Sequence, residues 1–114
     1  MSKDDARLLD MVTAAQRITE YIAGRSLDDF RRNNMLQDAV IRQLMVIGEA
    51  ARAVSEVARS RFPSVPWRQI SAARNIFVHE YARIDLETVW NIAAHDIKEL
   101  KTALAGIVPP ENKA

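Results

Sequence analysis

Apolar residues recur at steps of three and four along almost the whole 114-residue chain, and this spacing constrains the fold more than any other feature. Such steps place apolar side chains on one face of an α-helix. No segment shows the alternation of apolar and polar residues that is typical of a half-buried strand. The sequence therefore predicts an all-α fold.

Start and stop signals divide this pattern into four main helices and one short helix, the second in order. The expected bounds are 2–24, 26–32, 35–62, 66–81 and 85–106. Gly24 and the two prolines at 63 and 66 are the strongest breaks between them. Gly48 lies inside the long third helix, where it lets a neighbouring backbone approach at a cost of about 1 kcal/mol against alanine. The short connections favour an antiparallel up-and-down bundle.

The size of the chain suits one domain. Its residues, 48% of them apolar, are enough for one packed core and too few for two. We expect a single domain over 1–114, packed over about 5–106, with a flexible tail at 109–114. Cysteine is absent, and no apolar run approaches the roughly 20 residues that span a bilayer. Because no apolar signal-peptide core follows Met1, the expected location is the cytoplasm.

Positive charge is concentrated in one segment, although the net charge of the chain is only +1. Residues 59–83 carry five arginines and a single acid, Glu80. The planar fork of an arginine matches a phosphate group, so this segment is a candidate to bind a phosphodiester. The same arginines would equally suit the solvated face of a helix.

Four polar residues of contrasting chemistry, Arg74, Asn75, His79 and Tyr81, fall within eight positions of this segment. A metal-free attack on a phosphodiester needs one group that moves a proton and one that holds negative charge, and His79 and Arg74 are of these types. On one helix Asn75 and His79 share a face, whereas Arg74 and His79 are about 140° apart. Either the arginine stem wraps round the helix, or the helix loosens near His79, or the pair forms between two subunits.

Two of these interpretations have plainer alternatives. A histidine near a helix end is often a helix-terminus partner or an interface residue, and this applies to His79. Arg42, Glu49 and Arg52 border the apolar stripe of the third helix. They either form salt bridges at its rim, or Glu49 orients a group of the active site.

Metal and nucleotide-loop chemistry find no support in the sequence. The two histidines, His79 and His95, fall on different expected helices in a chain without cysteine. The three glycines stand alone, so no glycine-rich phosphate loop exists. We predict neither a metal nor a cofactor.

With this motif in hand, the chain resembles HEPN-domain proteins, specifically the HepT-type toxins of the MNT/HepT (nucleotidyltransferase/HEPN) toxin–antitoxin systems. Arg74, His79 and Tyr81 match the family pattern R-x4-H-x-Y, and Asn75 follows the arginine. The resemblance covers about residues 5–106. The segments that flank the motif in the family order are 37–42, 47–50, 66–70 and 84–90.

The resemblance implies a metal-independent endoribonuclease. His79 would take the proton from a ribose 2′-hydroxyl or deliver one to the leaving oxygen, and Arg74 would stabilise the phosphorane. The product would end in a 2′,3′-cyclic phosphate. Asn75 would position His79 or a phosphate oxygen, with Glu49 as an auxiliary residue.

The resemblance also implies partners. Family members are usually homodimers whose paired motifs line a shared cleft. Within the arginine-rich segment 59–83, Arg68 and Arg83 are the expected RNA-binding residues. Tyr81 would be adenylylated by a cognate MntA-like nucleotidyltransferase, which would silence the toxin because AMP adds bulk and negative charge in an RNA cleft. Glu80 stands where many members have glycine, and an acid beside His79 would raise its basicity or repel RNA.

Two other functions stay open at this point. The chain could be a non-catalytic HEPN subunit that docks a nucleotidyltransferase, presents Tyr81 or binds a nucleotide. It could also be a plain helical dimerisation module. The second alternative leaves the grouping of Arg74, Asn75, His79 and Tyr81 without a role.

Overall fold

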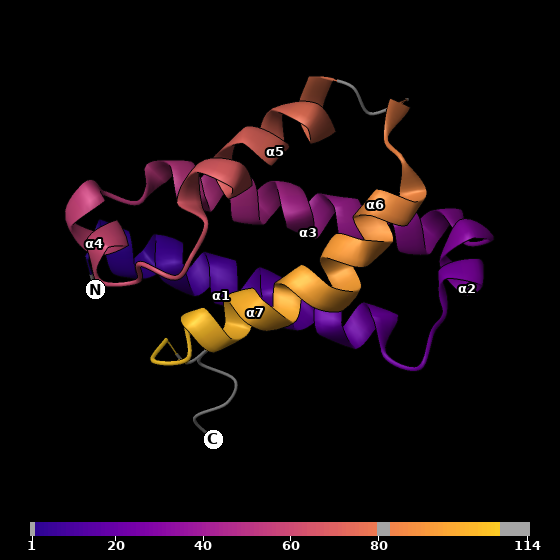
Figure 1. Ribbon diagram of the computed structural model, residues 1–114, viewed down its shortest axis with the longest axis horizontal. Helices are drawn as coiled ribbons and strands as arrows, with labels where there is room; N and C mark the ends of the chain where they lie inside the picture. The colour runs from indigo at the N-terminus through magenta and orange to yellow at the C-terminus, as the bar shows by residue number, and fades with distance from the viewer. Residues whose placement is uncertain (1, 80–82, 108–114) are drawn as a thin grey trace.

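Every regular element of the computed structural model is a helix over the residues that it describes, 2–79 and 83–107, with side chains over 2–77 and 83–107. In chain order they are α1 (Lys3–Ile22), α2 (Leu27–Arg31), α3 (Asn34–Ala53), α4 (Glu56–Ser60), α5 (Trp67–His79), α6 (Leu86–Asn91), the π-helical turn η2 (Ile92–Asp96) and α7 (Ile97–Ala103). The last three form one continuous helix. Figure 1 shows that this helix, α5, α3 and α1 run in alternating directions. The predicted all-α up-and-down bundle is confirmed.

Side-chain caps start the helices where the sequence indicates. The Ser2 hydroxyl accepts a hydrogen bond from the Asp5 amide at 3.0 Å, and the Asn33 side chain accepts one from the Leu36 amide at 3.0 Å. After α1 the chain turns at Gly24, whose φ of 72° lies in the left-handed region that favours glycine. These signals are local in the sequence, which is why the starts of α1, α2 and α3 agree with the prediction.

The helix expected over 35–62 is two helices, so this part of the prediction was wrong. The break falls between α3 and α4, where Val54 is extended with a ψ of 133° and Ser55 caps α4. Asp4 of α1 holds the break, because its carboxylate accepts hydrogen bonds from the Ser55 amide at 2.8 Å and from the Ser55 hydroxyl at 2.6 Å. Val54 and Ala58 are nevertheless both buried, so the apolar stripe continues across the break and hides it from periodicity.

The two hydrogen bonds from Ser55 hold the pKa of Asp4 below its usual range. Because the folded pKa is the lower one, this contact stabilises the fold above the unfolded pKa, and the effect is lost as the pH falls through the folded pKa. We expect Asp4→Asn to lower the Tm at neutral pH, with the difference from the wild type shrinking below the ordinary Asp pKa of 3.8. Thermal unfolding across the pH range measures this. The control is Asp10→Asn, which removes only an exposed pair with Arg7, and a pH-independent difference for Asp4→Asn would contradict the role of the charge.

The hydrophobic core lies mainly between α1 and α3, and the last helix packs along α1. Its largest fully buried side chains are Leu8, Met11, Ile18, Phe30, Val40, Val89 and Leu104. The ring of Phe30 on α2 lies against that of Trp90 on α6, with 5.5 Å between centroids. The short helix α2 therefore covers one end of the layer that α1, α3 and the last helix form.

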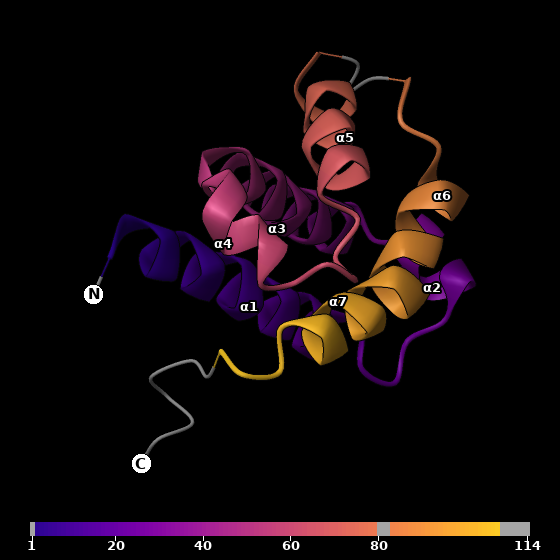
Figure 2. The ribbon, with the colours of Figure 1, turned by 60° about the vertical axis from the view of Figure 1, so that its left-hand side comes forward.

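α5 stands apart from this layer and packs chiefly on one of its helices, α3, as Figure 2 shows. The two helices approach closely at Gly48, where an added Cβ would lie only 2.5 Å from the Cβ of Arg74. The close approach expected at this glycine is confirmed. The backbone of α5 carries the candidate motif, so the Gly48 contact sets where that motif lies.

Candidate functional site

Arg74 lies at the junction of α5 with α3, where two contacts anchor its guanidinium. Its Nε donates to Oε1 of Glu49 on α3, and its Nη1 donates to Oδ1 of Asn75 at 3.1 Å. The Arg74 side chain keeps 22% of its surface exposed, and that of Glu49 keeps 53%. A guanidinium has five N–H donors. The two contacts therefore orient the group and leave further donors for an anion from solvent.

The three charged residues that border the apolar stripe of α3, namely Arg42, Glu49 and Arg52, differ in their contacts. Glu49 forms an ion pair, and its partner is the candidate catalytic arginine rather than a rim residue. Arg42 and Arg52 are exposed. Across the part of the chain that is described, neither has a carboxylate oxygen within 4.0 Å. Among residues 2–77 and 83–107, the rim salt bridges considered for these two arginines are thus not formed.

The backbone of α5 bears on how Arg74 and His79 could meet. The helix is continuous up to His79, its last residue, so it does not loosen before that position. The contact with Asn75 turns the Arg74 guanidinium toward the face of α5 that Asn75 and His79 share. Arg74 is therefore oriented as one of the three predicted arrangements requires, the one in which the arginine stem wraps round the helix toward His79. The side chain of His79, and Glu80 and Tyr81 as a whole, lie outside the described residues.

The five arginines of segment 59–83 do not form one uniform patch. Arg59 donates to a backbone carbonyl at the end of α3 at 3.0 Å, and its guanidinium lies 5.7 Å from the centre of the Trp67 ring. Arg61 pairs with a carboxylate of α1 at 4.0 Å. Arg68 and Arg83 are exposed. Arg59 and Arg61 thus join α4 and its loop to the bundle, a use that depends on distant residues and that composition did not reveal.

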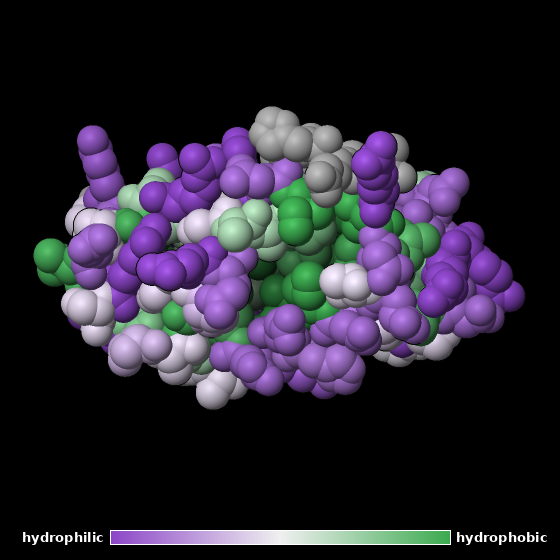
Figure 3. Space-filling view, turned by 45° about the horizontal axis from the view of Figure 1, so that its top comes forward, coloured by the Kyte–Doolittle hydropathy of each residue, from purple (hydrophilic) through white to green (hydrophobic). Residues whose placement is uncertain are grey.

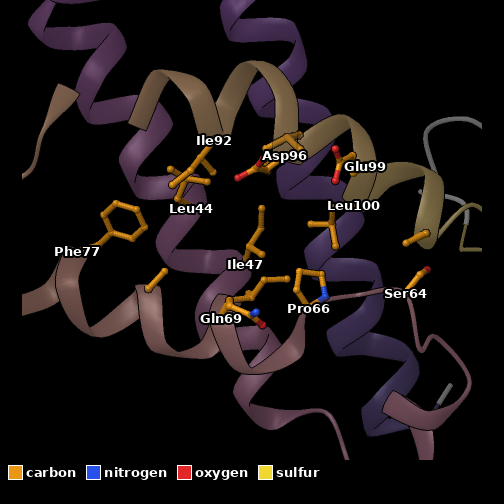
Figure 4. Close-up of a pocket in the computed structure, with 14 residues that line it drawn as sticks. Leu44, Ile47, Ser64, Pro66, Gln69, Phe77, Ile92, Asp96, Glu99 and Leu100 are labelled. Carbon is orange, nitrogen blue, oxygen red and sulfur yellow. The ribbon is translucent and has the colours of Figure 1, made fainter. Parts of the chain in front are cut away.

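A largely apolar pocket of about 420 Å³, the α5–α7 pocket, opens on the flank of α5 away from Asn75. Figure 3 shows it as an apolar hollow with a hydrophilic rim. In Figure 4 Phe77 on α5 and Ile92 on η2 face each other across a floor made by Leu44 and Ile47 of α3. Asp96 and Glu99 line the side formed by the last helix. This face of α5 is only partly covered, because Phe77 is buried whereas Ile70 and Ala73 are half-buried.

The described residues, 2–79 and 83–107, contain neither a metal-binding cluster nor a helix suited to cross a membrane. No group of three or more His, Cys, Asp or Glu side chains among them could hold a metal ion. None of the helices within 2–79 and 83–107 is long and apolar enough to cross a membrane. The second histidine, His95, is exposed on η2. The group of Arg74, Glu49 and Asn75 combines charge, fixed contacts and access to solvent.

Comparisons with known proteins point to one family. The family model described as ribonuclease HepT-like matches residues 11–107. A protein of Methanocaldococcus jannaschii named as a candidate RNase is 37% identical over 103 residues, which cover 89% of this chain and 94% of the relative. A protein of Thermococcus cleftensis named as a probable ribonuclease HepT is 32% identical over 94 residues, with coverage of 82% and 86%. No solved structure gives a significant match.

These matches extend over most of the bundle rather than over the motif alone. They include α3, which supplies Glu49 and Gly48, and α5, which supplies Arg74 and Asn75. The resemblance stated from the sequence is confirmed, and the chain belongs to the family of HepT-like ribonucleases.

Proposed function

We propose that the chain is an endoribonuclease that cleaves RNA without a metal ion, through attack of a ribose 2′-hydroxyl on the adjacent phosphorus. The P–O5′ bond breaks as the 2′-O–P bond forms, which gives a 2′,3′-cyclic phosphate and a 5′-hydroxyl. His79 takes the 2′-hydroxyl proton or delivers a proton to O5′. The observation that carries the proposal is the anchored Arg74 guanidinium, five residues before His79 on one helix of a HepT-like chain.

Arg74 stabilises the charge that develops on the phosphorane oxygens. Glu49 and Asn75 fix the guanidinium before substrate arrives, so little reorganisation is needed in the transition state. Asn75 also lies on the face that His79 shares and can hold the histidine or a phosphate oxygen. Arg68 and Arg83, both exposed, bind flanking RNA phosphates.

The direct test is cleavage of end-labelled RNA by purified protein in excess EDTA. We expect cleavage to persist and the new 3′ ends to carry a cyclic phosphate. Loss of activity in EDTA, or product ends of another type, would contradict the mechanism. Intact RNA in every condition, with unimpaired growth of cells that express the chain alone, would instead support a non-catalytic HEPN subunit.

Glu49 acts in this proposal as a positioning residue through its hydrogen bond to Arg74. We expect Glu49→Ala to lower kcat about tenfold, because a charge-assisted bond contributes about 1.5–3 kcal/mol and half-exposure reduces that value. Glu49→Gln keeps an acceptor oxygen and should stay within about threefold of the wild type. Single-turnover cleavage rates measure both. Equal losses in the two variants would show that the negative charge, and not the orientation of Arg74, is what Glu49 supplies.

The active form is a homodimer with a composite site in this proposal. One feature supports it: the α5–α7 pocket leaves an apolar face of α5 only partly covered, and Ile76 on the same helix is 51% exposed. Mixed dimers of Arg74→Ala and His79→Ala subunits should regain part of the cleavage activity. No recovery in verified mixed dimers would place both groups of a working site in one subunit.

The biological role in this proposal is that of a toxin in a toxin–antitoxin system. A cognate MntA-type nucleotidyltransferase silences the chain by adding AMP to Tyr81, two residues after the proposed catalytic histidine. The bulk and negative charge of AMP would keep RNA away from Arg74. Tyr81→Phe should cleave RNA normally and should resist silencing by that partner with ATP. Silencing of Tyr81→Phe as complete as that of the wild type would overturn the assignment.

A further inference from the structure

The outer face of α3 carries two arginines that the proposed mechanism does not use. Arg42 lies seven residues before Glu49, and Arg52 lies three residues after it. At 100° per residue, all three project from one side of the helix. Both arginines are exposed, and Glu49 between them is paired with Arg74. The α3 face beside the candidate site is therefore bordered by a cation at each end.

These two arginines differ in their contacts from five of the ten other arginines in the chain. Arg7, Arg31, Arg32, Arg61 and Arg74 each pair with a carboxylate. Within the residues described, Arg42 and Arg52 pair with none. An exposed guanidinium without a carboxylate partner keeps its full fork for an anion that arrives from solvent.

The close contact between Gly48 and Arg74 fixes where the two cations stand relative to the site. α3 and α5 run in opposite directions (Figure 1). At 1.5 Å per residue, Arg52 lies about 6 Å from Gly48 along α3, toward the start of α5. Arg42 lies about 9 Å from it in the other direction, toward the end of α5 that carries His79. Along α3, Arg42 and Arg52 thus lie on opposite sides of the residue that contacts Arg74.

We propose that Arg42 and Arg52 bind RNA phosphates on either side of the phosphate that Arg74 contacts, so that α3 forms half of the RNA-binding surface. This inference rests on the proposed ribonuclease function. A phosphate contact of this kind sets the position of the strand and carries no base preference. The pair thereby holds the strand across the α3–α5 junction while the chemistry takes place on α5.

The test measures binding separately from cleavage. The probe is a fluorescent single-stranded RNA in which every 2′-hydroxyl is methylated, so that no attack can occur. Affinity is measured by anisotropy between about 50 and 200 mM salt, because each single-strand phosphate contact adds about 0.7 to the slope of log K against log salt. We expect Arg42→Ala and Arg52→Ala each to lower the slope by about 0.7, and the double variant by about twice that amount.

The matched control is Arg17→Ala on α1, which removes one exposed arginine that likewise has no carboxylate partner among the described residues. Its slope should equal that of the wild type. Arg52→Lys should keep the slope, because lysine also binds phosphate as a point charge. Thermal unfolding of each variant shows that a changed slope does not come from a changed fold.

Three results would overturn the inference. They are slopes for Arg42→Ala and Arg52→Ala equal to the wild type, a slope for Arg17→Ala lowered as much as theirs, and no binding of the probe by the wild type. Failure of the proposed function is a separate result, since it appears as uncleaved unmodified RNA. A chain that binds the methylated probe through these arginines but leaves unmodified RNA intact would keep this inference and lose the ribonuclease.

Discussion

Replacing His79 with alanine is expected to lower RNA cleavage by about 10²- to 10⁴-fold, the usual contribution of a general acid or base. Alanine can neither accept the 2′-hydroxyl proton nor donate one to the leaving oxygen. The fold should persist, because His79 is the last residue of α5 and the contacts of Arg74 with α3 do not involve it. Initial cleavage rates in EDTA, with circular dichroism on the same samples, measure the two effects separately.

The control for this variant is His95→Ala. His95 is the other histidine of the chain, and it is exposed on η2. Its loss should change the cleavage rate less than twofold, in line with the small effects of surface substitutions. If His79→Ala cleaves as fast as the wild type, His79 has no catalytic role.

Gly48→Ala is expected to damage both stability and activity. The new Cβ would lie 2.5 Å from the Cβ of Arg74 and 3.3 Å from its Cα, atoms that cannot swing aside as the tip of a side chain can. Overpacking costs about 1–3 kcal/mol, against a gain of about 1 kcal/mol in helix propensity, so the net change should be destabilising by up to about 2 kcal/mol. A displacement of Arg74 by about 1 Å would lower the cleavage rate on the order of 10²-fold.

Gly106→Ala is the matched control, because, apart from its two chain neighbours, no atom of the described residues lies within 4 Å of a Cβ placed there. It should leave Tm and cleavage close to the wild-type values. Urea unfolding and single-turnover cleavage of the two variants test the prediction. Wild-type stability and activity in Gly48→Ala would mean that α5 can shift on α3 without consequence for Arg74.

The parts of the fold that follow from local signals were predictable. Apolar steps of three and four define α1, α3 and the last helix, and short-range caps such as Ser2 and Asn33 set the helix starts. The close approach at Gly48 was also predictable, since glycine inside a long helix has few other reasons to be there. The apolar steps and the caps share one property, which is that the residues involved lie within a few positions of each other.

The features that the sequence did not reveal depend on contacts between distant segments. The break at Ser55 is held by Asp4, 51 residues away. The use of Arg59 depends on the end of α3 and on Trp67, which come together only in the fold. The pairing of Arg74 with Glu49 is of the same kind, since the sequence marked both residues but not their contact.

The isolation of α5 also bears on the energetics of the chain. A helix that packs chiefly on one neighbour loses less buried contact when it opens. The free energy of opening should therefore be smaller for α5 than for α1 and α3, and its amides should exchange with solvent faster. Any molecule that binds α5 only in its docked position would raise that free energy. Hydrogen exchange along α5 would then report occupancy of the Arg74 region directly, whether the occupant is RNA or a second subunit.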